Sequence, residues 1–594
     1  IFLTGEKAKV PFSAKIGSFP TKKLQNEHPD LIARLDKFMM RVEDARKDRL
    51  ALANARRSLS LWGFAHRFLE HYEAHKQRLG WLDFDDLILR ARNLLSDPNV
   101  AQWVLYRLDG GIDHILVDEA QDTSPVQWQV IERLAQEFTS GSGARDDTQR
   151  TIFVVGDKKQ SIYSFQGADP AEFDRMRSEF GNRLEASQTP LQSLELEYSF
   201  RSSDAVLRVV DACFDVLPNT AFEQHIAFNS DLPGRVDLWP VVEKTETPEE
   251  GEWYDPVDRL SDTHHTVQLA QNIAWEIKRM IREKVTIPAK KGENGIYSQR
   301  PVRAGDFLIL VQRRSDLFQE IIRACKVAKL PIAGADRLKV GAEMAVKDLE
   351  ALLKFLGTPE DSLSLATVLR SPLLGWSEQE LFDLAHRRTT PFLWQALRDR
   401  GEEFPATMAF LGDLMGQTDF LRPYDLIERI LTRHDGRRKL LARLGNEAED
   451  GINALLSQAL AYERSTVPSL TGFLVWMETD DLEIKRQMDS ASDQIRVMTV
   501  HGSKGLEAPI VIMPDTGKRL LRMTDQIVES GDVALWNSGG ATAPDAVRTA
   551  REAKADAQRN ERMRLLYVAM TRAEKWLIVA AAGDLDKAGD TWYQ

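Results

Sequence analysis

The sequence predicts a multidomain α/β protein in which parallel strands are flanked by helices and one long segment is all-helical. At 594 residues the chain exceeds what one hydrophobic core can organise, and about three or four domains are expected. Short apolar segments alternate with amphipathic ones before residue 230 and again after it, which is typical of parallel sheets with crossover helices. The composition, 43% hydrophobic and 28% charged, is typical of folded globular domains.

The first part of the chain is predicted to be helical and then α/β. Residues 1–110 are expected to form a helical subdomain, because periodic apolar positions and many charges follow residue 30. Residues 80–87 (GWLDFDDL) indicate a loop that enters a helix with acids near its start. Residues 111–230 are expected to form the first α/β domain, with apolar strands at 115–117, 152–155 and 194–197.

The second α/β domain is predicted to be divided by a helical insertion. Residues 231–345 would form its first part and residues 491–594 its second, around helices at 346–490. The predicted elements are a β segment near 234–239, a helix at 266–281, a strand at 306–311, a helix at 316–328, strands at 495–500 and 509–513, a helix near 561–572 and a strand at 576–580.

The bulk properties exclude little about function. A net charge of −12 counts mildly against DNA binding, but a large enzyme can keep a local basic channel. Cys213 and Cys325 lie far apart, which suits a reducing cytoplasm and no disulfide framework or zinc site. No apolar stretch approaches the roughly 20 residues of a membrane span, so no membrane association is expected, and there is no signal peptide.

Residues 115–122 (ILVDEAQD) are the most informative segment. A buried parallel strand would deliver Asp118 and Glu119 to its C-terminal edge, where α/β sheets bind ligands. Asp118 could hold Mg²⁺, and Glu119 could polarise the water that attacks a phosphate. The alternative for this pair alone is a strand that ends in solvated acids.

A second segment, residues 154–168, combines a phosphate-sensing amide with two aromatic rings. A strand ends near Gly156, and the polar stretch that follows presents Gln160, whose amide could hydrogen-bond a terminal phosphate. Tyr163 and Phe165 would share a face if the segment were extended, which suits stacking on bases of a single strand. The alternative is that both rings belong to the core.

Two arginines and one turn complete the candidate residues. Arg201 follows an apolar stretch, and Arg572 follows an amphipathic helix; either guanidinium could stabilise charge in phosphoryl transfer. Alone, each could equally be a surface or packing residue. Residues 497–507 (VMTVHGSKGLE) indicate a strand followed by a turn whose small residues would let the backbone approach a phosphate chain. An ordinary β-turn-α connection is the alternative.

Taken together and in this order, these segments resemble the superfamily 1 helicases of the UvrD/Rep type. Within that family the likeness is greatest to the AddA subunits of AddAB helicase–nucleases, in their alphaproteobacterial form. It rests on residues 80–87 (GWLDFDDL), 155–170 (VGDKKQSIYSFQGADP), 498–515 (MTVHGSKGLEAPIVIMPD) and 564–575 (RLLYVAMTRAEK).

The resemblance implies two RecA-like domains with ATP between them. In the ATP site, Asp118 would bind Mg²⁺, Glu119 would activate water and Gln160 would contact the γ-phosphate. Other implied nucleotide contacts are the arginine fingers Arg201 and Arg572, the ribose-binding Glu507 with neighbouring Gly505, and Phe200 where an adenine-stacking Tyr is common.

The resemblance also implies a single-stranded DNA path across both domains. Tyr163 and Phe165 would stack on bases, and His501 would lie near the strand. Cycles of ATP binding and hydrolysis would move the protein 3′ to 5′, acting on DNA ends in double-strand break repair together with an AddB-like partner.

Some features depart from the family pattern. Ser199, Gln166 and Ala508 stand where the family usually has Asn, Arg and Phe. A P-loop, G-x-x-x-x-G-K-[ST], is missing from these residues, and so is a carboxylate–lysine nuclease signature. We therefore expect the chain to be the middle of a longer polypeptide. Two other hypotheses stay open: a stand-alone UvrD-like repair helicase, and a non-catalytic scaffold that binds DNA or a partner.

Overall fold

In the computed structural model, the described residues divide into two compact units. The first comprises residues 1–241, 504–507 and 516–594, and the second comprises residues 242–503 and 508–515. The structure describes residues 1–5, 8–97, 112–135, 150–186, 190–215, 224–245, 261, 263–292, 294–333, 337–445, 448–479, 483–485, 493–518, 523–585 and 591–594. The five-part division expected from the sequence stays a prediction.

The first unit begins with α1 (Lys22–Glu27), the 51-residue α2 (Pro29–Leu79) and α3 (Phe84–Ser96). Helix α2 ends where Gly80 takes the left-handed conformation, at φ 68°. The predicted loop into a helix is confirmed, because Asp83 and Asp86 cap the start of α3 reciprocally. Lys76 Nζ lies 2.9 Å from Asp83 and 2.6 Å from Asp86, which ties the end of α2 to α3.

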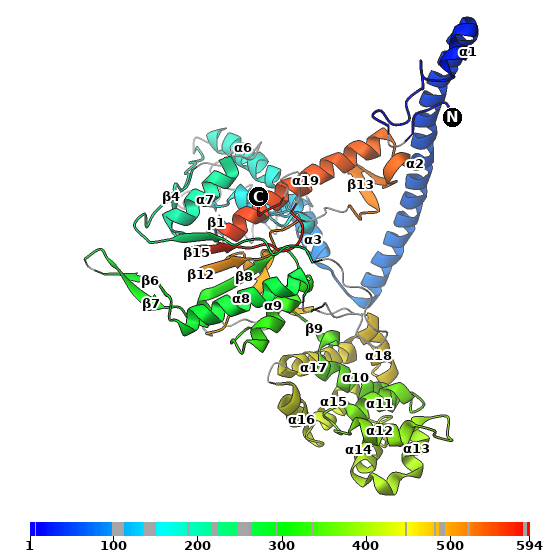
Figure 1. Ribbon diagram of the computed structural model, residues 1–594, viewed down its shortest axis with the longest axis vertical. Helices are drawn as coiled ribbons and strands as arrows, with labels where there is room; N and C mark the ends of the chain where they lie inside the picture. Colours follow the sequence, from blue (N-terminus) through cyan, green and yellow to red (C-terminus); the bar gives the residue numbers. More distant parts are fainter. Residues whose placement is uncertain are drawn as a thin grey trace. The chain divides into compact units, whose positions relative to one another are not determined.

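A hairpin that the sequence did not indicate packs on the middle of α2 (Figure 1). It consists of β13 (Ile527–Ser530) and β14 (Val533–Trp536), and its other neighbour is α19 (Asp545–Met570). The indole of Trp62 donates to the Ala534 carbonyl at 2.7 Å, and buried Asn54 donates to the Trp536 carbonyl at 2.8 Å. These bonds explain how a helix with few buried side chains is held along this stretch.

The first pair of parallel strands is β1 (His114–Val117) and β2 (Thr151–Val154), with Ile115 opposite Ile152. Trp128 of α5 (Pro125–Ala135) and Met176 and Phe180 of α6 (Pro170–Ala186) form the core beside them. Three 3₁₀ turns follow the strands: η1 (Ala120–Asp122), η3 (Lys158–Gln160) and η4 (Ser164–Gln166).

The predicted strand at 194–197 is wrong. Its Leu-Glu-Leu-Glu alternation is that of a strand, but Leu194 and Leu196 are 85% and 84% exposed and pair with no described strand. The strand instead is β3 (Tyr198–Ser199), parallel to β4 (Ile226–Ala227), and α7 (Asp204–Asp215) follows β3. In the same unit β15 (Ala573–Val579) runs parallel to β5 (Arg235–Leu238).

The second unit contains three parallel strands in the order β11, β8, β12. Central β8 (Phe307–Val311) is buried along its whole length, as expected for a strand covered on both faces. The other elements here are β11 (Arg496–Thr499), β12 (Ala508–Met513), α8 (His265–Arg282), α9 (Asp316–Val327) and the hairpin β6 (Thr286–Lys291)–β7 (Tyr297–Pro301). The α/β class is therefore confirmed.

The predicted helical insertion is confirmed as a cluster with its own core (Figure 1). Only the short pair β9 (Arg337–Lys339) and β10 (Glu483–Lys485) interrupts the helical pattern at its ends. Its helices are α10 (Met344–Gly357), α11 (Ser362–Arg370), α12 (Glu378–Ala385), α13 (Leu393–Asp399), α14 (Pro405–Met415), α15 (Pro423–Thr432), α16 (Gly436–Leu444), α17 (Ala448–Ser465) and α18 (Leu470–Thr479). Across the described part of the chain, no helix combines the length and apolarity needed to span a membrane.

The buried Asp348 makes this helical cluster pH-sensitive. Burial raises the pKa of Asp348 from 3.8 to about 6, so above that pH the folded state holds a costly buried charge. The free energy of unfolding should rise as pH falls through 6. Asp348→Asn should stabilise the protein at pH 8 by on the order of 3 kcal/mol, and by about half of that at pH 5. Thermal unfolding at the two pH values tests this; an equal effect at both, or an equal effect of exposed Asp419→Asn, would contradict it.

Candidate functional site

The first acidic pair lies on a sharp turn at the end of β1. Glu119 has φ 51° and ψ 39°, a left-handed conformation that is uncommon outside glycine and is concentrated at functional sites. The turn begins η1 at once, where the Ala120 amide donates to the Val155 carbonyl at 3.0 Å. The Glu119 amide donates to Asp118 Oδ1 at 2.8 Å. Both carboxylates are therefore placed at the strand edge, as the sequence predicted.

Gln121, which the sequence reasoning did not select, joins the two strand ends. Its Nε2 donates to Glu119 Oε2 at 2.5 Å, and its Oε1 accepts from the Asp157 amide at 2.9 Å. The side chain is fully buried, and a Cβ on Gly156 would approach Gln121 Oε1 to 2.6 Å. Glycine is thus required for this close approach, and the amide fixes the carboxylate of Glu119. An amide two residues after the acid was the available signal.

Lys504 is the second residue that the prediction missed as a site residue. Its Nζ lies 3.0 Å from Glu119 Oε2, bonds the carboxylate of Asp122 and donates to the Gln160 carbonyl at 3.2 Å. Burial raises the pKa of Asp122 above its usual value, and the Lys504 ammonium opposes that rise. The same ammonium lies 5.4 Å from the ring centroid of Tyr163. One cation therefore contacts two acids, a strand-end backbone and an aromatic ring.

Gln160 and Arg572, 412 positions apart in the sequence, are in direct contact. Arg572 Nη2 donates to Gln160 Oε1 at 3.2 Å, and Gln160 Nε2 donates to Asp157 at 2.9 Å. Arg572 is only 1% exposed and also donates to the carbonyls of Val568 and Leu506. Burial lowers its pKa to about 10, and repulsion from Arg201 adds to this effect. The guanidinium stays charged at neutral pH and is aimed at the predicted phosphate-sensing amide.

Arg201 and Glu507 form the next contact. Arg201 Nε lies 2.7 Å from Glu507 Oε2, and both side chains remain partly accessible. Gly505, at φ 82°, occupies a backbone conformation that side chains rarely adopt. Phe200 is 64% exposed, with its ring centroid 4.5 Å from that of Phe228, so one aromatic face is available for a base.

Tyr163 and Phe165 lie together, although not as expected. The segment is the 3₁₀ turn η4 rather than an extended strand, so the predicted backbone is wrong. The ring centroids are nevertheless 5.8 Å apart, and Phe165 is 67% exposed, which excludes a core position for that ring. His501 begins η8 (His501–Ser503) in the second unit.

The residues present fit a magnesium ion that is held mainly by nucleotide and water. Asp118 supplies one carboxylate at a strand edge, and Mg²⁺ in such sites takes one or two carboxylates besides phosphate oxygens. In the ranges that the structure describes, no group of three His, Cys, Asp or Glu side chains could hold an ion by itself. A metal here would therefore depend on a bound phosphate.

Comparison with known proteins matches both ends of this arrangement. Residues 10–181 match the UvrD/REP helicase N-terminal domain, and residues 442–583 match the UvrD-like helicase C-terminal domain. An ATP-dependent helicase/nuclease subunit (AddA) from Listeria monocytogenes serotype 4b (strain F2365) is 28% identical over 565 residues, covering 89% of this chain and 44% of that protein. A protein of the same name from Lactiplantibacillus plantarum is 26% identical over 584 residues, with the same coverage. The chain spans less than half the length of these two relatives.

Proposed function

This chain contains the N-terminal and C-terminal domains of the UvrD-like helicases, and we propose that it is the ATP-driven motor of an AddA-type helicase–nuclease. The observation that carries the proposal is the contact of Arg572 with Gln160, beside the Lys504–Glu119 ion pair. Residues from distant segments have no packing reason to aim charged groups at one another. A shared phosphate-bearing ligand supplies that reason.

In the hydrolytic step, the acids at the end of β1 do the chemistry. Asp118 would hold Mg²⁺, which neutralises phosphate charge when bound with ATP. Glu119, fixed by Gln121, would accept a proton from the attacking water. Gln160 would contact the γ-phosphate while Arg572 orients its amide oxygen.

The remaining nucleotide contacts come from the neighbouring turns. Arg201 and Arg572 would stabilise the charge that develops on the transferred phosphoryl group. The Arg201–Glu507 pair would open as Arg201 turns to phosphate and Glu507 to the ribose. Phe200 would stack on adenine, and Gly505 would let the backbone approach the nucleotide closely.

Single-stranded DNA would bind at the aromatic pair that follows η3. Tyr163 and Phe165 would stack on bases, with His501 near the strand. Lys504 contacts both Glu119 and the Tyr163 ring, so a base stacked on Tyr163 would shift the cation that neutralises the catalytic acid. This contact gives DNA binding a direct route to hydrolysis, and repeated cycles would move the protein 3′ to 5′.

The role of the whole protein follows from its relatives' names. We place it in double-strand break repair and recombination in the cytoplasm, acting on DNA ends as a heterodimer with an AddB-like partner and with a nuclease or exonuclease activity. Residues 111–230, and residues 231–345 with 491–594, would be the two RecA-like domains, with helical parts at 1–110 and 346–490. A motor of this kind requires both domains to engage ATP.

The test is ATP hydrolysis and strand translocation by the full-length gene product. We expect hydrolysis to rise when single-stranded DNA is added, and streptavidin to be displaced from a 5′-biotinylated strand faster than from a 3′-biotinylated one. The 594 residues alone contain no P-loop, so they should hydrolyse ATP at background rates. DNA binding by the full-length product without any hydrolysis would contradict the motor and favour a scaffold.

A further inference from the structure

A row of exposed side chains runs along one face of α2. Arg57, Leu61, Phe64, Phe68 and Tyr72 are spaced three or four apart, so they share that face, and we call them the α2 stripe. Phe64 is 67% exposed and Phe68 54% exposed. The ring centroids of Phe64 and Phe68 are 6.0 Å apart with planes inclined by 22°, and those of Phe68 and Tyr72 are 6.0 Å apart at 10°. The stripe is a ladder of nearly parallel, accessible rings.

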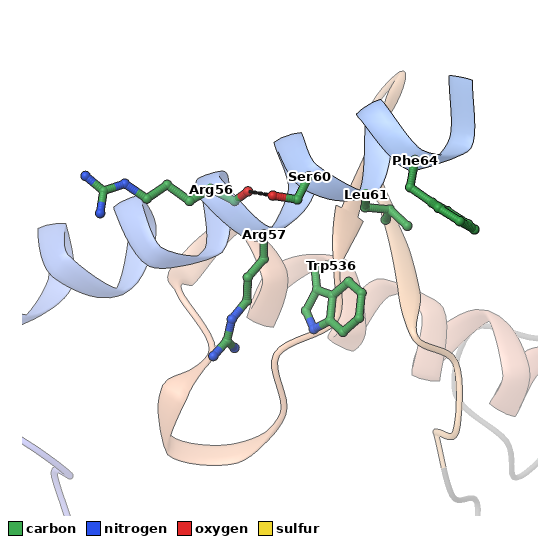
Figure 2. A pocket seen from close by; sticks show the side chains of 6 residues that line it. All are labelled: Arg56, Arg57, Ser60, Leu61, Phe64 and Trp536. Atoms are coloured by element: carbon green, nitrogen blue, oxygen red, sulfur yellow. Dashed lines mark hydrogen bonds between the residues drawn. The ribbon is translucent and has the colours of Figure 1, made fainter. Parts of the chain in front are cut away.

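At one end the stripe enters a hollow between α2 and the β13–β14 hairpin. Figure 2 shows Arg57, Leu61 and Phe64 projecting from α2 on the side where the indole of Trp536 lies, with Arg56 extending along the helix. The hollow has a volume of about 760 Å³. The bonds of Trp62 and Asn54 to the hairpin hold its two walls together. The site is therefore built on fixed elements.

The charge around the stripe is opposite to that of the chain. Five Lys and Arg residues against two carboxylates lie between Arg56 and Leu79, whereas the whole chain carries −12. Within the described ranges, the guanidinium groups of Arg56 and Arg57 make no ion pair. Accessible cations beside aromatic faces attract a ligand that has both negative charge and flat rings.

We propose that the α2 stripe binds single-stranded nucleic acid, separately from the aromatic pair Tyr163 and Phe165. Bases would stack on the ladder, and Arg56 and Arg57 would pair with phosphates. One base inserted between two rings requires roughly 6.8 Å, twice the rise of about 3.4 Å per base, which is close to the 6.0 Å between adjacent rings. A protein partner fits less well, because the centre of a protein interface is depleted of charged residues.

The experiment measures binding of a fluorescein-labelled oligothymidylate to this chain by anisotropy at several salt concentrations. Phe64→Ala and Phe68→Ala should each weaken binding about ten-fold, the loss of one stacked base. The matched control is Leu59→Ala, which removes a 66% exposed side chain from the opposite face of α2. Arg57→Glu should weaken binding and lower the slope of log affinity against log salt by about 0.7. Arg41→Glu makes the same charge change elsewhere on α2 and should alter the affinity less.

The proposed motor and this site are separable in the same assay. The Phe64→Ala and Phe68→Ala losses should persist when Tyr163 and Phe165 are both replaced by Ala, because the stripe binds independently. Photocrosslinking with an iodouracil oligonucleotide should label the peptide that contains Phe64 and Phe68. Unchanged DNA affinity in the stripe variants overturns the proposal, and so does a result in which they only lose a protein partner. Loss of DNA-stimulated hydrolysis without any effect of the stripe would support the motor and reject the stripe.

Discussion

Replacing Glu119 with Gln in the full-length gene product is expected to lower single-stranded-DNA-stimulated ATP hydrolysis by about 10²–10⁴-fold, the contribution of a positioned general base. The amide keeps the size of the carboxylate but cannot take a proton from water. Affinity for ATP should be nearly unchanged, because Glu119 is bonded to Gln121 and Lys504 rather than placed to hold phosphate. Hydrolysis is measured by phosphate release, and affinity with a fluorescent ATP analogue.

The matched control is Glu185→Gln, the same chemical change at an exposed position near the end of α6. It should leave both hydrolysis and affinity as they are. A parallel loss of ATP affinity in Glu119→Gln would mean that this carboxylate helps to hold the nucleotide and its metal. Full hydrolysis in the variant would move the general base elsewhere, with Asp122 the nearest other acid on Lys504.

The Glu119 region shows how far local sequence reasoning reaches. An apolar run followed by acids predicts a strand edge, and that much was confirmed because both features lie within eight consecutive residues. The partner of Glu119, Lys504, lies hundreds of positions away, so no local pattern pairs them. The buried bridge of Gln121 to Asp157 also depends on which strand lies beside β1, and spacing alone does not give this.

The errors in the fold have the same origin. Residues 194–197 alternate as a strand does, but alternation describes a side chain's face and not the presence of a neighbour to pair with. The β13–β14 hairpin was missed for the opposite reason. Its strands are four residues each, and they are stabilised by bonds from α2, which lies more than 450 positions earlier in the chain. Long periodic helices, such as α8 and α9, were predicted well because their apolar faces are complete within each segment.

Arg572 gives the second large expected effect. In the full-length gene product, Arg572→Ala should lower DNA-stimulated ATP hydrolysis by about 10³-fold or more, the effect of removing an arginine finger. Arg572→Lys should restore little of it, because an ammonium cannot reach Gln160 Oε1 and the Val568 and Leu506 carbonyls with one planar fork. Steady-state hydrolysis measures both variants. Arg559→Ala, an exposed arginine on the same helix, should change it little.

Because Arg572 is buried, a purely structural role must be separated from a catalytic one. A structural role would lower the unfolding temperature of Arg572→Ala and reduce DNA affinity and hydrolysis together. An arginine finger acts mainly in the transition state, so the turnover number should fall far more than the affinity for ATP. The lysine variant sharpens this distinction, since it keeps the charge and most of the buried chain while losing the geometry. Normal turnover in a stable Arg572→Lys protein would show that charge alone suffices, and the contact with Gln160 would then orient nothing that hydrolysis needs.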